Sequence, residues 1–237
     1  MTPTDREQVV QTNVSAMLQV LSEVLPLAVG VSASAAAVIA LVLILQGDRA
    51  TSSGSTFTLG WLAGVGAVCA TGIGLGIAVA SDPVPWTQWL RVFLGLGLLF
   101  QAGRTWQTRT PADQNAAQPK WMAGLQQASP RYAGILGFAL GSINPKNLML
   151  TLGAAAAIGN NGLAPAEIWI MSLAYVFVAS LCVAIPMTIY LLMRSRAEHI
   201  LGSLGSWMGV NSAGITITVL LIFGIKLTLG GIAGLIG

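Results

Sequence analysis

The stretch Gly141–Thr151, with the sequence GSINPKNLMLT, places a proline, a lysine and two asparagines inside a segment that is otherwise apolar enough to cross a bilayer. In hydrocarbon, a polar side chain or a backbone group without a hydrogen-bond partner is costly, because lipid tails supply no partner. We therefore interpret the rest of the chain as the helices that surround this stretch and satisfy its polar groups.

The composition excludes a soluble domain. Of the 237 residues, 54% are hydrophobic and only 8% are charged, and the mean hydropathy is +0.76. A soluble domain carries about 25% charged residues. The chain is therefore predicted to be an integral membrane protein.

The apolar segments do not alternate with polar residues at every second position, as the strands of a membrane barrel would, so they are predicted to be helices. The expected fold is an all-α polytopic membrane protein with six transmembrane helices. An amphipathic, interfacial helix at Met1–Glu23 is expected to lead into the first of them. The predicted spans are Val24–Leu45, Ser55–Ala80, Trp86–Arg104, Arg131–Ile158, Ala166–Met193 and Trp207–Gly237.

The domain organisation is predicted to be a 3+3 inverted repeat. Residues 1–104 hold the amphipathic segment and the first three spans, residues 105–130 form a polar cytoplasmic linker, and residues 131–237 hold the second three spans. Three spans on each side of a loop place the two halves in opposite orientations. Gly30–Leu45 and Gly141–Ala156 also resemble each other, since both open with small polar residues and continue apolar. Inverted repeats are a recurring transporter architecture with a binding site near the midplane.

The basic residues predict the orientation. Those of the odd-numbered connections are Arg49, then Arg104, Arg109, Lys120 and Arg131, then Arg194 and Arg196. The opposite side has Arg6 alone, together with acidic residues. The protein is therefore expected to be a multi-pass protein of the cytoplasmic (inner) membrane. By the positive-inside rule, the odd-numbered connections face the cytoplasm and both termini are expected on the outer side of this membrane.

The candidate substrate-binding residues are in the fourth span and, with a smaller role, in the first. Lys146 is about 20 Å from either end of the predicted fourth span, too far for its side chain to reach water easily. Pro145 removes a backbone donor and frees carbonyl groups near Ser142. Two interpretations remain open: a broken helix that lines a substrate path, with Lys146 attracting an anionic group, or a proline kink whose polar groups serve packing alone. The full candidate set is Ser32, Ser34, Ser142, Asn144, Pro145, Lys146 and Asn147.

The sequence shows no pattern typical of an enzyme. It contains no nucleophile–base pair, paired carboxylates, phosphate-binding glycine loop or metal-ligand spacing, and His199 is its only histidine. Cys69 and Cys182 lie in apolar stretches and are interpreted as small buried residues. We therefore expect no catalytic residues, no metal, no cofactor and no nucleic-acid partner, and any transport would not be driven by ATP bound to this chain.

The run GSINPKNLMLTLGAAAAIG resembles the Asn-Pro-Lys-Asn-Leu signature of the GAP family, the peptidoglycolipid-addressing proteins of actinobacteria within the LysE transporter superfamily. In the first half, Gln46–Ala50, Gly54 and Phe57–Gly64 resemble the basic turn and the following span of that family. The resemblance is clearest over Leu25–Ala67 and Gly134–Leu192. It implies a LysE-like fold and a protein of the cytoplasmic membrane that helps to export an envelope glycolipid, with a larger lipid transporter as partner.

One departure from the family concerns the first span. The family carries an S-P-x-P-like run where this chain has Ser32-Ala33-Ser34-Ala35. A helix break in the first span is therefore undecided by the sequence. An asymmetric site follows as the expectation, with Asn144, Pro145 and Lys146 contributing more than Ser32 and Ser34.

Three hypotheses for the function remain open. Export or hand-over of an envelope glycolipid predicts a lateral opening with apolar walls around Lys146. A small-solute exporter for an amino acid or ion predicts a compact aqueous cavity with opposed charges. A non-transporting accessory subunit of a lipid export machine predicts that Lys146 is dispensable. The glycine-rich spans permit a homodimer without requiring one.

Overall fold

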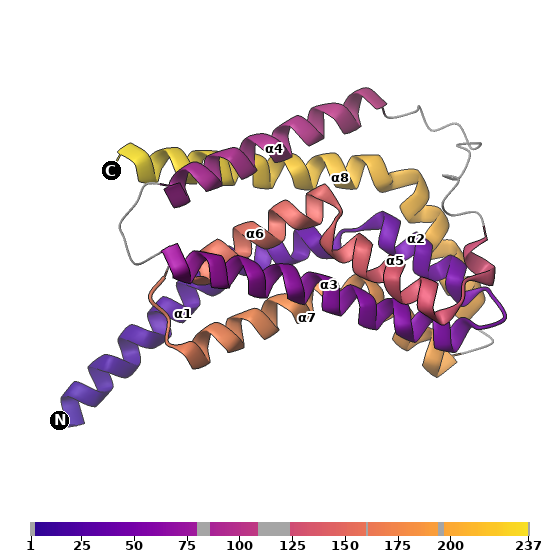
Figure 1. Cartoon of the computed structure of the whole chain (residues 1–237), viewed down its shortest axis with the longest axis horizontal. Helices are drawn as coiled ribbons and strands as arrows, with labels where there is room; N and C mark the ends of the chain where they lie inside the picture. Colours follow the sequence, from indigo (N-terminus) through magenta and orange to yellow (C-terminus); the bar gives the residue numbers. More distant parts are fainter. Residues whose placement is uncertain (1–2, 80–85, 109–123, 160, 194–196, 237) are drawn as a thin grey trace.

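The computed structural model describes residues 3–79, 86–108, 124–159, 161–193 and 197–236 (Figure 1). All regular secondary structure within these residues is helical. The helices are α1 (Pro3–Ser32), α2 (Ala35–Leu45), α3 (Ala50–Val79), α4 (Trp86–Thr108), the short 3₁₀ helix η2 (Leu125–Gln127), α5 (Pro130–Ser142), α6 (Pro145–Gly159), α7 (Pro165–Met193) and α8 (Ala197–Ile236).

The chain is a membrane protein. Within the described residues, four helical segments are long and apolar enough to cross a bilayer. They are Val14–Ser32 in α1, Ala50–Leu75 in α3, Pro165–Met193 in α7 and Ala213–Ile236 in α8. The helices α5 and α6 are 13 and 15 residues long, so that neither spans by itself.

The start of the first predicted span is wrong. Instead of a separate helix before Val24, one helix runs from Pro3 to Ser32 without interruption. Val20 and Val24 are both buried against the other helices, so the predicted boundary between them falls inside one packed helix face. The apolar stretch of this helix therefore begins at Val14 rather than at Val24.

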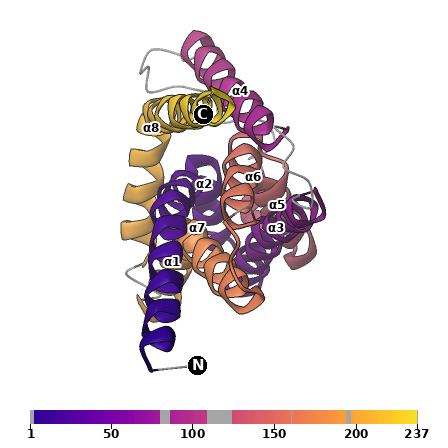
Figure 2. The ribbon, with the colours of Figure 1, turned by 90° about the vertical axis from the view of Figure 1, so that its left-hand side faces the viewer.

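The two halves of the chain pack mainly against each other. The most extensive contacts are those of α3 with α5 and of α4 with α8, followed by those of α3 with α6 and of α1 with α7. If α1–α2 is matched with α5–α6, α3 with α7 and α4 with α8, then the α3–α5 pair corresponds to the α7–α1 pair. Figure 2 shows α4 beside the C-terminal part of α8, on one side of the other helices. Figure 1 shows both chain ends at the same end of the molecule.

The α3–α5 contact depends on glycine. A Cβ at Gly60 would collide with the Gly134 carbonyl of α5, and a Cβ at Gly137 would collide with the Phe57 carbonyl of α3. Small residues that let helix backbones approach closely are typical of helix pairs in membranes. This contact holds α5, and with it the start of α6, against the middle of α3.

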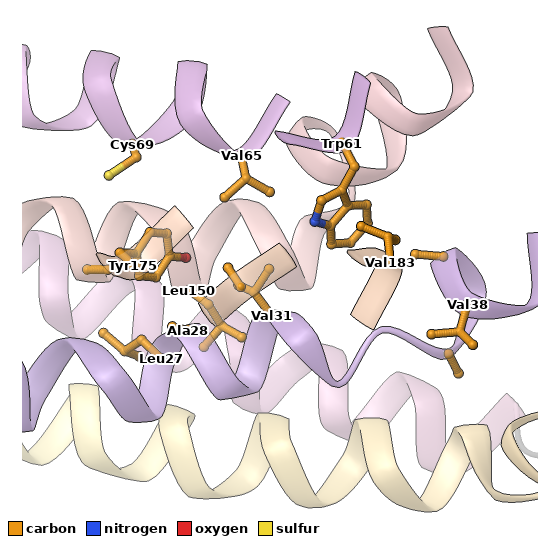
Figure 3. Packing of buried hydrophobic residues seen from close by; sticks show 14 of the residues in the cluster. Leu27, Ala28, Val31, Val38, Trp61, Val65, Cys69, Leu150, Tyr175 and Val183 are labelled. Atoms are coloured by element: carbon orange, nitrogen blue, oxygen red, sulfur yellow. The ribbon is translucent and has the colours of Figure 1, made fainter. Parts of the chain in front are cut away.

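The buried core lies around the place where α3, α6 and α7 meet α1. Figure 3 shows Cys69, Val65 and Trp61 along α3, opposite Tyr175 and Val183 of α7. Leu150 of α6 and Val31 of α1 are buried in the same cluster. The break between α1 and α2 and the break between α5 and α6 both adjoin this core.

Candidate functional site

The break between α5 and α6 follows from the Asn-Pro-Lys-Asn sequence. Asn144 is the residue before a proline, a position that disfavours the helical backbone. Its side-chain oxygen accepts a hydrogen bond from the Lys146 backbone N–H at 3.1 Å, which caps the start of α6. Pro145 is the first residue of α6, where the missing N–H costs no helical hydrogen bond.

The Asn147 side chain supplies a hydrogen-bond donor to the C-terminal end of α5. In a continuous helix the Leu140 carbonyl would accept from the N–H of Asn144. Here it accepts instead from the Asn147 side-chain amide at 3.0 Å. The asparagine side chain thus replaces a backbone hydrogen bond across the break, at a position that is fully buried.

The first span is also broken, although it contains no proline at the break. Helix α1 ends at Ser32, α2 begins at Ala35, and Ser34 has φ −103° and ψ 88°, outside the helical region. The Ser34 N–H binds the Ser32 carbonyl, and the Ala37 N–H binds the Ser34 carbonyl. The Gly30 and Ala33 carbonyls are thereby left without the partners that a continuous helix would supply.

Lys146 supplies those partners. Its Nζ donates to the Gly30 carbonyl at 2.9 Å and to the Ala33 carbonyl at 2.7 Å. An ammonium group at the C-terminal end of a helix is also favoured by the helix dipole. One side chain from the second break therefore completes the first, so that the two breaks form a single paired structure. This pairing is the candidate site.

The other predicted residues occupy different surroundings. The Ser142 hydroxyl donates to the Phe138 carbonyl of its own helix at 2.7 Å. Ser32 lies beside the Cys182 thiol of α7, which is itself near Lys146. Ser34 is buried and its side chain makes no capping hydrogen bond, while Pro145 is exposed. The contact between the two broken segments is thus made by the Gly30 and Ala33 backbone carbonyls, and the smaller role predicted for Ser32 and Ser34 in substrate binding stays a prediction.

The surroundings of Lys146 differ from both predicted cavities. The side chain is only 5% exposed and packs directly against backbone carbonyls. Within the part of the chain that the structure describes, Lys146 therefore lines no lateral opening in this conformation. The carbonyls also take the place of the opposed charges that a small-solute site would provide.

Sequence reasoning missed a set of buried polar groups close to the breaks. The Tyr175 hydroxyl of α7 and the Thr151 hydroxyl of α6 are 2.8 Å apart, and both residues are fully buried. The indole N–H of Trp61 and the hydroxyl of Ser180 are also buried. A tyrosine, a tryptophan or a serine in an apolar segment is common enough that only its burial, which depends on packing, distinguishes it.

The comparisons with known proteins agree with a lipid-addressing family, as the Asn-Pro-Lys-Asn-Leu signature indicates. No curated protein and no solved structure matches the chain. A family described as Sap, sulfolipid-1-addressing protein, matches residues 24–233. This range contains both helix breaks and nearly the whole chain, and the protein therefore belongs to the sulfolipid-1-addressing family.

Proposed function

We propose that this protein exports an envelope glycolipid across the cytoplasmic membrane, or hands it on to a larger lipid transporter. In this proposal the chain crosses the membrane six times, as two inverted three-span repeats of the LysE type. The name of the family, which refers to the addressing of a sulfolipid, supports a lipid that carries an anionic headgroup.

The observation that carries the proposal is the buried Lys146 that joins the two helix breaks. Transporters built from inverted repeats bind their substrates at discontinuous helices near the midplane. An ammonium group has three N–H donors, of which Lys146 gives one each to Gly30 and Ala33. An anionic headgroup would compete with these carbonyls for the ammonium and so separate α1 from α6.

The helix contacts support the inverted repeat. Matching each helix of the first half with one of the second carries the α3–α5 contact onto the α7–α1 contact, and the α4–α8 contact onto itself. Each half also begins with a broken segment, α1–α2 or α5–α6. In an alternating mechanism, the Lys146 hydrogen bonds would break as one half rocks against the other.

A second candidate function is a non-transporting accessory subunit of a lipid export machine. The observation in its favour is that the Lys146 ammonium donates hydrogen bonds to two backbone carbonyls of the chain itself, those of Gly30 and Ala33. Such bonds serve the stability of the two broken segments without any substrate.

Lipid movement in reconstituted vesicles tests the proposal. The probe is a fluorescent sulfated glycolipid, and its accessibility to a membrane-impermeant quencher reports transfer between leaflets. We expect Lys146→Gln, which keeps donors but removes the charge, to slow transfer about tenfold or more. The matched control is Lys226→Gln, because the Lys226 side chain of α8 is exposed and should be dispensable.

Two results would contradict the proposal. A wild-type protein that moves no lipid by itself would favour the accessory subunit. If a folded Lys146→Gln variant transfers lipid as fast as the wild type, the two helix breaks joined by Lys146 have no role in transport.

A further inference from the structure

Three buried polar atoms near the paired breaks have no hydrogen-bond partner within the described residues. They are the indole Nε1 of Trp61 in α3, the side-chain Oδ1 of Asn147 in α6 and the hydroxyl Oγ of Ser180 in α7. Each of these residues is at most 2% exposed. An unpartnered buried polar group is costly, and native proteins seldom retain several in one region without a ligand or a function.

These atoms belong to helices that contact one another at the level of the second break. Figure 3 shows the Trp61 indole extending from α3 towards Val183 of α7. Ser180 lies three residues before Val183 and is therefore on a neighbouring part of the same helix face. A Cβ at Gly141 would lie 2.9 Å from the Trp61 carbonyl, and Asn147 binds the carbonyl of the adjacent Leu140. The helices α3, α6 and α7 are in mutual contact.

The donor and acceptor properties of the three atoms specify the class of ligand. The indole N–H of Trp61 only donates. Asn147 Oδ1, an amide oxygen, only accepts, and the amide nitrogen of the same side chain already donates to the Leu140 carbonyl. An anion would suit Trp61 but would be repelled by Asn147 Oδ1, and an ammonium group would suit Asn147 but not Trp61. A hydroxyl group suits both, because it accepts and donates at once.

We propose that Trp61, Asn147 and Ser180 form a binding site for sugar hydroxyls of the lipid headgroup. This inference rests on the proposed function and adds the sugar to the anionic group that Lys146 would recognise. Asn147 follows Lys146 directly in α6, so the two recognition elements are adjacent in the first turn of one helix. The site is closed in this conformation, and because its residues belong to α3, α6 and α7, ligand entry requires that these helices move apart.

The hydroxyl can come from a sugar or from a bound water molecule, and one experiment distinguishes them. The probe is an uncharged, photoactivatable glucosyl diacylglycerol in phosphatidylcholine vesicles, with the same lipid lacking glucose as the reference. Trp61→Phe removes the N–H and retains an aromatic ring. Its matched control is Trp169→Phe, since Trp169 of α7 is 68% exposed.

We expect Trp61→Phe to weaken glucosyl-lipid crosslinking about three- to tenfold, as the loss of one hydrogen bond implies. Trp169→Phe and the glucose-free lipid should show no such difference. Ser180→Ala, which makes a smaller change in the core, should weaken the same crosslinking and provides the test if Trp61→Phe does not fold.

Two outcomes would overturn the inference. A site that holds only water predicts that Trp61→Phe lowers the melting temperature equally with and without the glucosyl lipid and leaves crosslinking unchanged. A wild-type protein that does not prefer the glucosyl lipid also overturns it, even if sulfated lipid is moved. Conversely, if the wild-type protein moves no lipid but Trp61→Phe weakens binding of the glucosyl lipid, the proposed transport function is contradicted and the proposed sugar-binding site is supported.

Discussion

At the scale of single residues, each polar residue of the Asn-Pro-Lys-Asn run supplies hydrogen bonds to a different helix end. Asn144 caps the start of α6, Lys146 completes the end of α1, and Asn147 completes the end of α5. Each role replaces a backbone hydrogen bond that a helix break removes. In a membrane such replacement is required, because no water is available for the freed carbonyls.

The role of Asn147 can be measured by substitution. Asn147→Leu keeps a similar size but leaves the Leu140 carbonyl buried without a partner, which should cost about 1–3 kcal/mol of unfolding free energy. The measurement is reversible unfolding in detergent micelles. Asn211→Leu is the control, because the Asn211 amide binds only a carbonyl of its own helix in an exposed position, and should cost less than about 0.5 kcal/mol. Equal costs for the two variants would contradict the bridging role.

At the scale of elements, the α3–α5 pair requires glycine where the backbones meet. Gly60→Ala should destabilise the protein by about 1–3 kcal/mol, because the added Cβ has no room beside the Gly134 carbonyl. Gly66→Ala in the same helix is the matched control, since nothing lies within 4 Å of a Cβ there. It should be neutral or stabilise the protein by about 0.5–1 kcal/mol, because alanine is the better helix former. Thermal unfolding of both variants in detergent is the measurement: Gly60→Ala should lower the melting temperature, and Gly66→Ala should leave it unchanged or raise it.

The break in the first span predicts that proline is tolerated at the start of α2. Ala35 is the first residue of α2, the position that Pro145 occupies in α6. Ala35→Pro should therefore leave stability unchanged or raise it by about 0.4–1 kcal/mol, by restricting the unfolded chain. Ala40→Pro, in the interior of α2, should cost about 3 kcal/mol or more.

A melting temperature lowered as much by Ala35→Pro as by Ala40→Pro would mean that the first span is continuous. The same comparison therefore shows whether the break between α1 and α2 is present in the membrane as it is in the structure.

At the scale of the whole molecule, Lys146 joins two helix breaks, and the two halves of the chain pack mainly against each other. The charge distribution predicts how these halves are oriented in the membrane. Single cysteines placed in a background with Cys69 and Cys182 replaced by alanine allow a direct measurement of this orientation.

We expect Ala166→Cys, at the exposed start of α7, to react with a membrane-impermeant maleimide in intact cells. Ser52→Cys, at the exposed start of α3, should react only after the cells are permeabilised. The predicted orientation places these two helix starts on opposite sides of the membrane. Reaction of both cysteines in intact cells, or of Ser52→Cys alone, would contradict it.

The sequence by itself determined the class of protein, the approximate positions of most helices and Pro145 as the point at which the fourth span is broken or kinked. Apolar length and low charge decide membrane insertion, and the effect of Pro145 on its neighbours is local. These properties depend on residues near in the chain, so they can be inferred without knowing which helices touch. The same reasoning predicted the ends of α3, α4 and α7 to within about five residues, but it placed the start of α8 at Trp207, ten residues after its start at Ala197.

Only the tertiary structure decided the break in α1–α2 and the partners of Lys146. Ser32-Ala33-Ser34-Ala35 is compatible with a continuous helix, and what compensates its break is a lysine more than 110 residues away in the chain. The burial of Trp61, Ser180 and Tyr175 is likewise a property of packing. A local pattern cannot predict such features, because their free energy comes from contacts between distant segments.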